Sequence, residues 1–369
     1  MTLGMLGFLV AVSALVSICV TPLVRQAALW LGIMDQPGPR KIHRSPIPRA
    51  GGVAVYLAWL VAMMMGMNLL GIPTVWSHPD SLIGLGLLAL LLGLWDDWAD
   101  LPGVVKLLGQ IGVASAVFAA GIRIDRLTHP LGGTLLFPGV LSYLVTVLWV
   151  VGMMNAVNLI DGLDGLASGV VAIASLGLVA AGLHTQNVLS VMCFAALVGA
   201  CGGFLVHNFF PAKIFLGDAG SQFLGLVLAA APLVEFPYKS ATAVALLIPL
   251  TSLALPISDT WLALVRRFRG RRSIFLADRY HLHHRLLKMG LSHRQVVLFF
   301  YLVSLYLGCV AFIFVLIPER YAAVLLVLLA LGSVMGMRTL RFMEFRLRAR
   351  YRKRFTSSRA GEKTHEPKN

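Results

Sequence analysis

The chain has 369 residues, of which 58% are hydrophobic and only 13% charged, with a mean hydropathy of +0.82. Soluble domains carry about 25% charged residues, so these few charges cannot keep so large an apolar core in water, and lipid must cover much of the surface. The composition excludes a soluble protein and predicts an all-α integral membrane protein. The net charge of +15 would suit nucleic acid, but the placement of the charges does not.

Apolar runs of the length that crosses a bilayer, about 17–25 residues, recur along the sequence. The first has no basic segment before it and no small-residue cleavage pattern, so we expect a retained helix rather than a signal peptide. We predict eleven transmembrane helices, at residues 4–24, 51–72, 81–95, 104–122, 139–160, 166–184, 188–207, 219–235, 241–265, 295–317 and 321–338.

The lysines and arginines orient these helices. Eleven spans place the termini on opposite sides, and the loops on the side of the C-terminus hold 27 of the 31 basic residues. Because basic loops remain in the cytoplasm, we predict an N-terminus outside the cell and a cytoplasmic C-terminus.

The sequence divides into a polytopic domain, residues 1–338, and a tail, residues 339–369. The tail mixes basic residues with leucine, phenylalanine and tyrosine. This pattern predicts an amphipathic helix on the inner leaflet, held by anionic lipids rather than by nucleic acid. We expect residues 356–369 to be disordered.

The first unusual cytoplasmic loop is DQPGPRKIHRSPIPRAGG, residues 35–52. Its prolines and glycines prevent a helix and give a turn-rich frame for a cluster of cations. We expect this cluster to bind an anionic ligand. Its members are Arg40, Lys41, His43, Arg44 and Arg49.

The second, GLWDDWADLPGVVKLLGQ, places Asp96 and Asp97 at the membrane end of an apolar helix. Charges there are costly unless they are used. Adjacent helical residues point about 100° apart, so we expect one carboxylate to face the site and the other a structural cation. Lys106 would meet a phosphate or one of these aspartates.

The third, NAVNLIDGLDGLASG, repeats a polar residue every three positions at the end of a span. At this spacing the side chains share one side of a helix, and polar groups at this depth are generally functional. We therefore predict a stripe of two amides and two carboxylates. It consists of Asn155, Asn158, Asp161 and Asp164.

The fourth, HNFFPAKIFLGDAGSQ, places Asp218 in a glycine-rich turn before an apolar helix. This carboxylate would hold Mg²⁺ through oxygen or cap the helix. Asn208 and the phenylalanines 209, 210 and 215 suit hydrogen bonding and stacking on a nucleobase.

The fifth, RRFRGRRSIFLADRYHLHHRL, brings His281, His283 and His284 together among arginines. Zinc sites usually add an acid or a cysteine, so phosphate is the better ligand for this loop. Together the loops offer carboxylates for a hard cation, cations for phosphates and aromatic rings for a base. The combination indicates phosphoryl transfer between a nucleotide substrate and a lipid.

Five segments resemble, in order from about residue 20 to 340, the polyprenyl-phosphate N-acetylhexosamine-1-phosphate transferases. They are DQPGPRKIHRSPIPRAGG, WDDWADLPGVVKLLGQ, NAVNLIDGLDGLA, FPAKIFLGDAGS and DRYHLHHRL. The resemblance implies transfer of a sugar phosphate from a UDP-N-acetylhexosamine to undecaprenyl phosphate, with release of UMP. It also implies Mg²⁺ or Mn²⁺ as cofactor, the cytoplasmic face of the bacterial inner membrane as location, and a lipid-linked cell-envelope glycan as destination. The family also admits a homodimer.

The resemblance assigns roles to residues. Those at the reacting phosphates would be Asp96, Asp97, Lys106 and Asp161. The metal ligands would be Asp218 and Asp161. Those that bind substrate would be Lys41, His43, Asn155, Asn158, Asp164, Asn208, Phe215, Arg269, His281, His283 and His284.

Several alternatives stay open on the sequence alone. The His-Leu-His-His order after Asp278 resembles that of the amino-sugar transferases and favours UDP-N-acetylglucosamine over another UDP-N-acetylhexosamine or the UDP-muramoyl-pentapeptide. Direct attack by the lipid phosphate and a covalent aspartyl intermediate both fit these residues. A transporter is the non-enzyme alternative. It would have polar groups near the midplane of the membrane and an internal repeat, whereas the polar groups of this sequence cluster at the cytoplasmic ends of the helices and no inverted repeat is visible.

Overall fold

The computed structural model describes residues 2–37, 45–72, 78–128, 134–234 and 282–316, with a few isolated positions beyond them. The predicted spans 241–265 and 321–338 lie almost wholly outside these residues. The basic tail, residues 339–369, lies entirely outside them.

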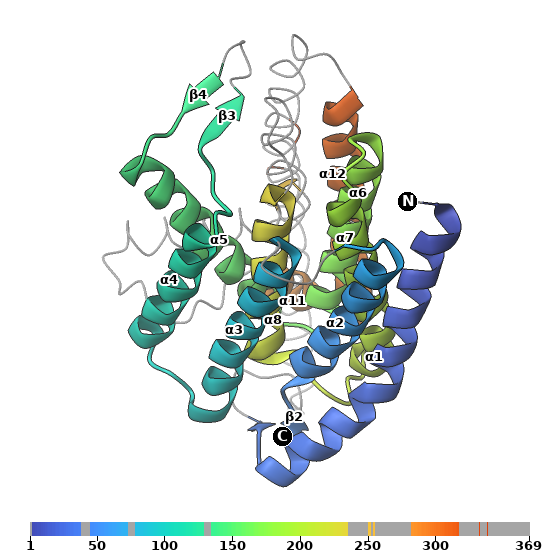
Figure 1. Ribbon diagram of the computed structural model, residues 1–369. Helices are drawn as coiled ribbons and strands as arrows, with labels where there is room; N and C mark the ends of the chain where they lie inside the picture. The colour runs from blue at the N-terminus through green and yellow to red at the C-terminus, as the bar shows by residue number, and fades with distance from the viewer. Residues whose placement is uncertain are drawn as a thin grey trace, which may run out of the picture.

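The described chain is almost entirely helical (Figure 1). Its helices are α1 (Leu3–Leu31), α2 (Gly51–Leu69), α3 (His78–Ala99), α4 (Gly103–Ala119), α5 (Val140–Ile160), α6 (Leu166–His184), α7 (Val188–Asn208), α8 (Gly217–Ala230), α11 (Leu282–Lys288) and α12 (His293–Leu316), with the 3₁₀ turn η1 (Ala231–Leu233) after α8. Two short antiparallel pairs, which the sequence analysis did not foresee, join strands in the loops. They are β1 (Met34–Asp35) with β2 (Ile47–Pro48), and β3 (Arg126–Thr128) with β4 (Thr134–Leu136).

Among the described residues, seven helices are long and apolar enough to cross a membrane: α1, α2, α3, α5, α6, α7 and α12. The prediction of an all-α membrane protein is confirmed, and the total of eleven spans stays a prediction. Helix α4 has 17 residues, and α8 has 14, fewer than the predicted 219–235. The α-helix ends before Pro232, whose ring excludes the backbone N–H that a continued helix needs.

The helices stand side by side around α7 and α8 (Figure 1). Helix α8 packs against α2, α3 and α5, while α7 packs against α1, α2 and α6. Helix α4 lies at the edge, on α3 and α5. Within the membrane-spanning windows, 78% of α7 is buried but only 17% of α1. The apolar outer face of α1 is therefore available to lipid.

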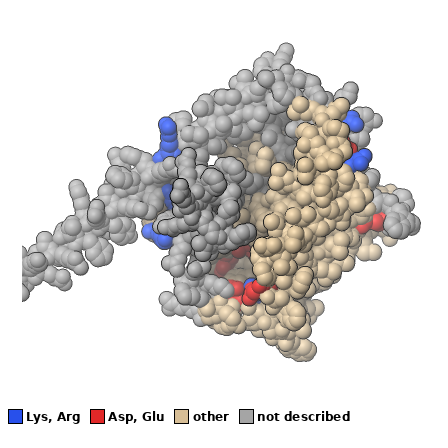
Figure 2. Space-filling model, turned by 90° about the vertical axis from the view of Figure 1, so that its left-hand side faces the viewer, with Lys and Arg blue, Asp and Glu red and all other residues tan. Residues whose placement is uncertain are grey.

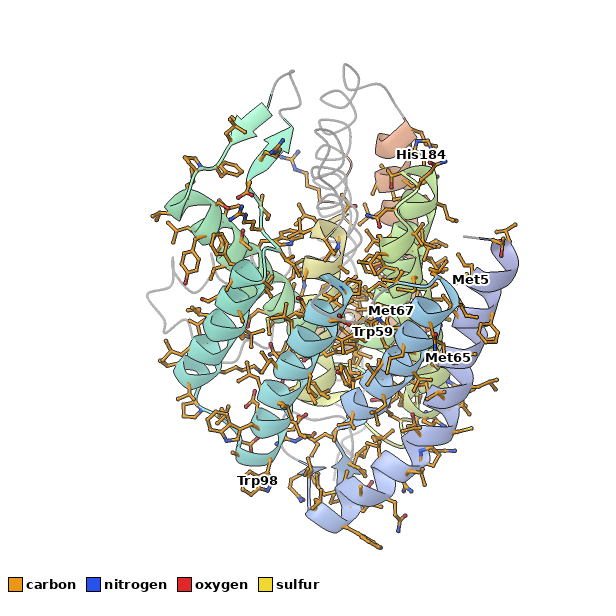
Figure 3. All side chains as sticks on the ribbon, in the orientation of Figure 1. Met5, Trp59, Met65, Met67, Trp98 and His184 are labelled. Carbon is orange, nitrogen blue, oxygen red and sulfur yellow. The ribbon has the colours of Figure 1, made fainter. Side chains whose placement is uncertain are left out.

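The two ends of the bundle differ. At one end α1 and α3 finish, α2 and α4 begin, and β1 pairs with β2; the β3–β4 hairpin lies at the other (Figure 1). Trp98 marks the first end and His184 the second (Figure 3). The aspartates and asparagines that the sequence analysis singled out belong to the Trp98 end.

Small residues bring α1 and α7 into close contact. Ser13 Oγ donates to the carbonyl of Ala196 at 2.7 Å, and Ser17 Oγ donates to that of Ala200 at 2.8 Å. A Cβ on Gly203 would overlap the carbonyl oxygen of Ala14. Lipid tails are as apolar as the side chains, so the hydrophobic effect does not drive helices together within the membrane. Close packing of small residues and hydrogen bonds between helices do so instead.

We expect Gly203→Val to force α1 away from α7 and to cost about 1–3 kcal/mol, seen as a lower thermal midpoint in detergent. Gly202→Val is the matched control, because the neighbouring glycine is exposed and a Cβ there meets nothing within 4 Å. Equal midpoints for the two variants would contradict this account of the interface.

Candidate active site

Lys106 is the centre of the site at the Trp98 end. It lies in the first turn of α4, and its Nζ is 2.7 Å from Asp96 Oδ2 and 2.9 Å from Asp218 Oδ1. Asp96 is in the last turn of α3 and Asp218 in the first turn of α8. Three helices thus place one ammonium between two carboxylates, and the expectation that Lys106 meets one of the aspartates is confirmed.

Asp96 is fully engaged by the protein. Besides the ion pair of Oδ2, its Oδ1 accepts a hydrogen bond from the Leu101 amide at 2.9 Å. Its side chain is only 8% exposed. Removing a charge from water costs several kcal/mol, and both oxygens of Asp96 have partners that offset this cost.

Asp97 points elsewhere and caps another helix. Its Oδ1 and Oδ2 accept the backbone N–H groups of Asp218 and Ala219, each at 2.9 Å. These are among the first amides of α8, whose own N-cap residue, Leu216, has no side chain able to accept them. The expectation that the neighbouring aspartates face different partners is confirmed. Asp97, rather than Asp218, caps α8.

Arg49 is turned toward carboxylates, and its predicted part in binding an anionic ligand stays a prediction. Its guanidinium lies 2.6 Å from Asp100 Oδ1, 3.7 Å from Asp35 Oδ1 and 3.8 Å from Asp97 Oδ1. Burial opposes the charge, but the hydrogen bond to Asp100 and the nearby carboxylates raise the pKa of Arg49 above its ordinary value. The arginine ties the first loop to α3.

Glycines allow two helices to approach the start of α8. A Cβ on Gly52 of α2 would overlap the amide of Gly220, and one on Gly93 of α3 would overlap the carbonyl of Asp218. Gly217 has a φ of 76°, and a Cβ there would lie 2.5 Å from Asp97 Oδ2. The position of Asp218 is therefore fixed by backbone contacts on several sides.

Helix α5 adds Asn158 to the site. Its Oδ1 accepts from Lys106 Nζ at 3.4 Å, while its Nδ2 donates to Asp218 Oδ1 and to Ser221 Oγ, the latter at 2.9 Å. Asn155 lies one turn away and bonds Gln110 instead of facing the acids. The predicted four-residue stripe is only half correct, because α5 ends at Ile160.

Asp161 follows the end of α5 directly. Burial raises the pKa of its carboxyl well above the usual range, and the carboxylates of Asp218, Asp97 and Asp164 raise it further, against a hydrogen bond from Gly217. All three of these charged neighbours are carboxylates. A cation bound here would relieve this repulsion.

The donor set suits a hard cation. Asp161 and Asp218 supply carboxylate oxygens, which Mg²⁺ and Mn²⁺ prefer. Within the described ranges, no three histidine, cysteine, aspartate or glutamate side chains are gathered as a ready metal cluster. Two carboxylates leave room for substrate phosphates and water as further ligands, the usual manner of binding Mg²⁺.

Asp164 and Asn208 hold the loop between α7 and α8. Asp164 Oδ2 accepts from the Ala212 amide at 2.9 Å. Asn208 is buried; it accepts from the Gly165 amide at 3.1 Å and donates to the Ile214 carbonyl at 3.0 Å. The observed contacts of these two side chains are therefore with the chain itself.

Phe215 is half-buried, and its amide donates to the carbonyl of Pro48 at 2.8 Å, so its segment lies beside β2. Several predicted substrate residues lie outside the described residues: Lys41, His43, Arg269 and His281. His283 and His284 belong to α11, and the structure does not describe their side chains.

Sequence reasoning missed Gln110, Gln222 and His293 as members of this region. The two glutamines bond each other at 2.9 Å, and the ring of His293 stacks on that of Phe210 at 4.4 Å. The signal for the glutamines was present, because each is a polar residue one helical turn from a charged one inside an apolar run.

Figure 2 shows acidic side chains in a hollow near the lower end of one face and at its rim. The acids, Lys106 and the amides described above lie together at the end of an apolar bundle.

Comparison with known proteins agrees with this chemistry. Residues 80–235, which include most of these groups, match the model of glycosyl transferase family 4. The chain belongs to this family, whose polyprenyl-phosphate sugar-1-phosphate transferases its five segments resemble.

Individual relatives extend the match over most of the chain. A probable undecaprenyl-phosphate N-acetylglucosaminyl 1-phosphate transferase of Bacillus subtilis is 38% identical over 79% of this chain and 80% of its own length. A decaprenyl-phosphate N-acetylglucosaminephosphotransferase of Mycobacterium leprae is 38% identical over 81% and 80%. A phospho-N-acetylmuramoyl-pentapeptide-transferase of Desulforudis audaxviator is 31% identical over 78% and 90%.

We expect Asp97→Asn to lower the thermal midpoint, because one of the two α8 amides loses its acceptor, at a cost of about 0.5–2 kcal/mol. Asp100→Asn makes the same chemical change on a carboxylate that is 83% exposed and bonds the same Arg49. Its effect should be under about 1 kcal/mol. If Asp100→Asn proved as destabilising as Asp97→Asn, the capping role would be lost.

Proposed function

We propose that the protein transfers N-acetylglucosamine 1-phosphate from UDP-N-acetylglucosamine to undecaprenyl phosphate and releases UMP. The observation that carries the proposal is the position of Lys106 between Asp96 and Asp218 at one end of a membrane bundle. The site offers a cation for phosphates and carboxylates for a metal, at the ends of helices long enough to cross a membrane.

In this reaction an oxygen of the lipid phosphate attacks the β-phosphorus of the UDP-sugar. A new phosphoanhydride bond forms, the bond to the UMP oxygen breaks, and UMP leaves with the electron pair. The attacking phosphate is already largely ionised near neutral pH, since the second pKa of a phosphomonoester is about 6. Placement and charge neutralisation therefore supply most of the catalysis.

Lys106 would attract the phosphates and offset their charge as they approach each other. Asp96 would orient this ammonium and the lipid phosphate. Because both oxygens of Asp96 already have partners, we favour direct attack by the lipid over a covalent aspartyl intermediate.

Asp218 and Asp161 would hold Mg²⁺, or Mn²⁺ in its place. When bound, the cation would neutralise charge on the diphosphate of the donor. Asn158 would fix the orientation of Asp218, to which it donates a hydrogen bond. Asp97 would also position Asp218, because it accepts a hydrogen bond from the backbone amide of that residue.

The relatives support the amino sugar. Those named for N-acetylglucosamine are 38% identical in Bacillus subtilis and Mycobacterium leprae and 30% in Yersinia pestis, beside 31% for the pentapeptide transferase of Desulforudis audaxviator. A different UDP-N-acetylhexosamine would leave the mechanism unchanged. The glycan built on the product would begin at the inner membrane of the cell.

We place the site on the cytoplasmic side. The loops at the Trp98 end belong to the set that carries 27 of the 31 basic residues, and the β3–β4 hairpin at the other end belongs to the poor set. The donor would then come from the cytoplasm, where nucleotide sugars are made.

With purified protein, undecaprenyl phosphate and Mg²⁺, we expect UMP release with UDP-N-acetylglucosamine in a panel of UDP-sugars. EDTA should abolish the release, and added Mg²⁺ or Mn²⁺ should restore it. UMP release with a different UDP-sugar alone would change the sugar that we assign to the donor. Folded protein that releases no UMP with any donor would overturn the proposal and favour a transporter.

We expect Asp218→Asn and Asp96→Asn each to lower kcat by at least about 10²-fold, since each loses a charge at the reacting phosphates. Asp125→Asn is the matched control, because that carboxylate pairs with Arg123 at the opposite end. Near-normal turnover in either site variant would remove that residue from the mechanism.

A further inference from the structure

A buried layer of amides lies one helical turn from the site. Asn155 Nδ2 donates to Gln110 Oε1 at 2.7 Å, and Gln110 Nε2 donates to Gln222 Oε1 at 2.9 Å. Gln110 is 1% exposed and Gln222 is fully buried. We refer to Gln110, Asn155 and Gln222 as the amide layer.

Each member of the amide layer shares a helix face with a site residue. On α4, Gln110 follows Lys106 by one turn; on α8, Gln222 follows Asp218 by one turn. On α5, Asn155 precedes Asn158 in the same way. Residues at these spacings lie one above the other on a helix, so the layer repeats the geometry of the site one turn deeper.

Helix α4 depends on this layer for its relation to α8. Its main described packing is against α3 and α5. The side-chain hydrogen bonds that the structure describes between α4 and α8 join Lys106 to Asp218 and Gln110 to Gln222. A Cβ on Gly225 would lie 2.5 Å from Met154 Cα, so α5 and α8 approach at their backbones. The α4–α8 pair has directional hydrogen bonds instead.

The layer also carries a cost. Gln222 Nε2 is buried and has no hydrogen-bond partner among the described residues. A buried polar group without a partner costs about 1–3 kcal/mol. Apolar residues would pack here at lower cost, whereas amides fix a register, because sliding α4 breaks both hydrogen bonds of the layer.

We infer that Gln110 and Gln222 are positioning residues for the transfer reaction. They fix the register of α4 against α8 and thereby hold Lys106 Nζ against Asp218. The inference rests on the proposed function and adds two residues that contact neither substrate nor metal.

The test uses Gln110→Met, Gln222→Met and the double variant in the full-length protein. Methionine matches glutamine closely in shape. Gln222→Met leaves Gln110 Nε2 without its acceptor, and Gln110→Met leaves Gln222 Oε1 without its donor, so each single variant should lower the thermal midpoint. Asn155 Nδ2 also loses an acceptor in Gln110→Met but keeps its bond to the Val151 carbonyl. The double variant removes both partners of the Gln110–Gln222 bond, so its midpoint should return toward that of the wild type. Because the register is no longer fixed, kcat of the double variant should still fall about 10–100-fold.

Ser17→Ala is the matched control. It also removes a buried hydrogen bond between helices, of 2.8 Å, but between α1 and α7. All rates are measured well below the lowest midpoint. A reduced kcat in the double variant beside a normal kcat in Ser17→Ala supports the inference. A normal kcat in the double variant, or an equal loss in Ser17→Ala, overturns it. An inactive wild type would instead defeat the proposed function.

Discussion

Lys106 is held between Asp96 and Asp218 because none of these charges is stable alone at the end of an apolar bundle. Their mutual attraction offsets the loss of hydration and draws together helices α3, α4 and α8. The same balance leaves a deficit of positive charge around Asp161, whose neighbours are carboxylates. One ammonium faces the two carboxylates of Asp96 and Asp218, and Asp161 adds a further acid, so the site is net negative. Such a site suits a metal cation, whose charge also offsets that of the phosphate groups.

The surroundings of this ion pair are rigid in a particular way. The N-terminus of helix α8 is capped by Asp97, a residue of α3, and glycines of α2 and α3 contact the backbone of its first turn. Arg49 joins the first loop to the same place. Side chains that take part in chemistry must be positioned to a fraction of an ångström, and here backbone contacts, rather than bulky packing, provide that precision.

The sequence predicted the helices well and the site partly, for physical reasons. Every segment that crosses the bilayer must be long and apolar, and the basic loops lie on one side. The spans were therefore visible in the composition of the sequence. Asp96, Lys106, Asn158 and Asp218 were visible because each is polar where polarity is costly. Apart from the pairing of Lys106 with an aspartate, the partners were not visible: Asp97 as a cap of α8 and Arg49 as a partner of acids depend on contacts between distant segments. Periodicity also carried the stripe past Ile160, where the glycines of the turn end the helix.

The pairings also have an order in time. Asp96, Asp97, Lys106 and Arg49 all belong to the first third of the chain, while Asp218 lies 112 residues after Lys106. During synthesis, the early helices can enter the bilayer with Lys106 already neutralised by Asp96 and Asp97 by Arg49. Both pairs persist in the folded protein, and the later arrival of α8 adds Asp218 to Lys106 and two backbone amides to Asp97. A chain that ended before α8 would thus have paired charges that the membrane tolerates, but it would lack Asp218 and with it the site. Chemistry therefore cannot begin before α8 has been added.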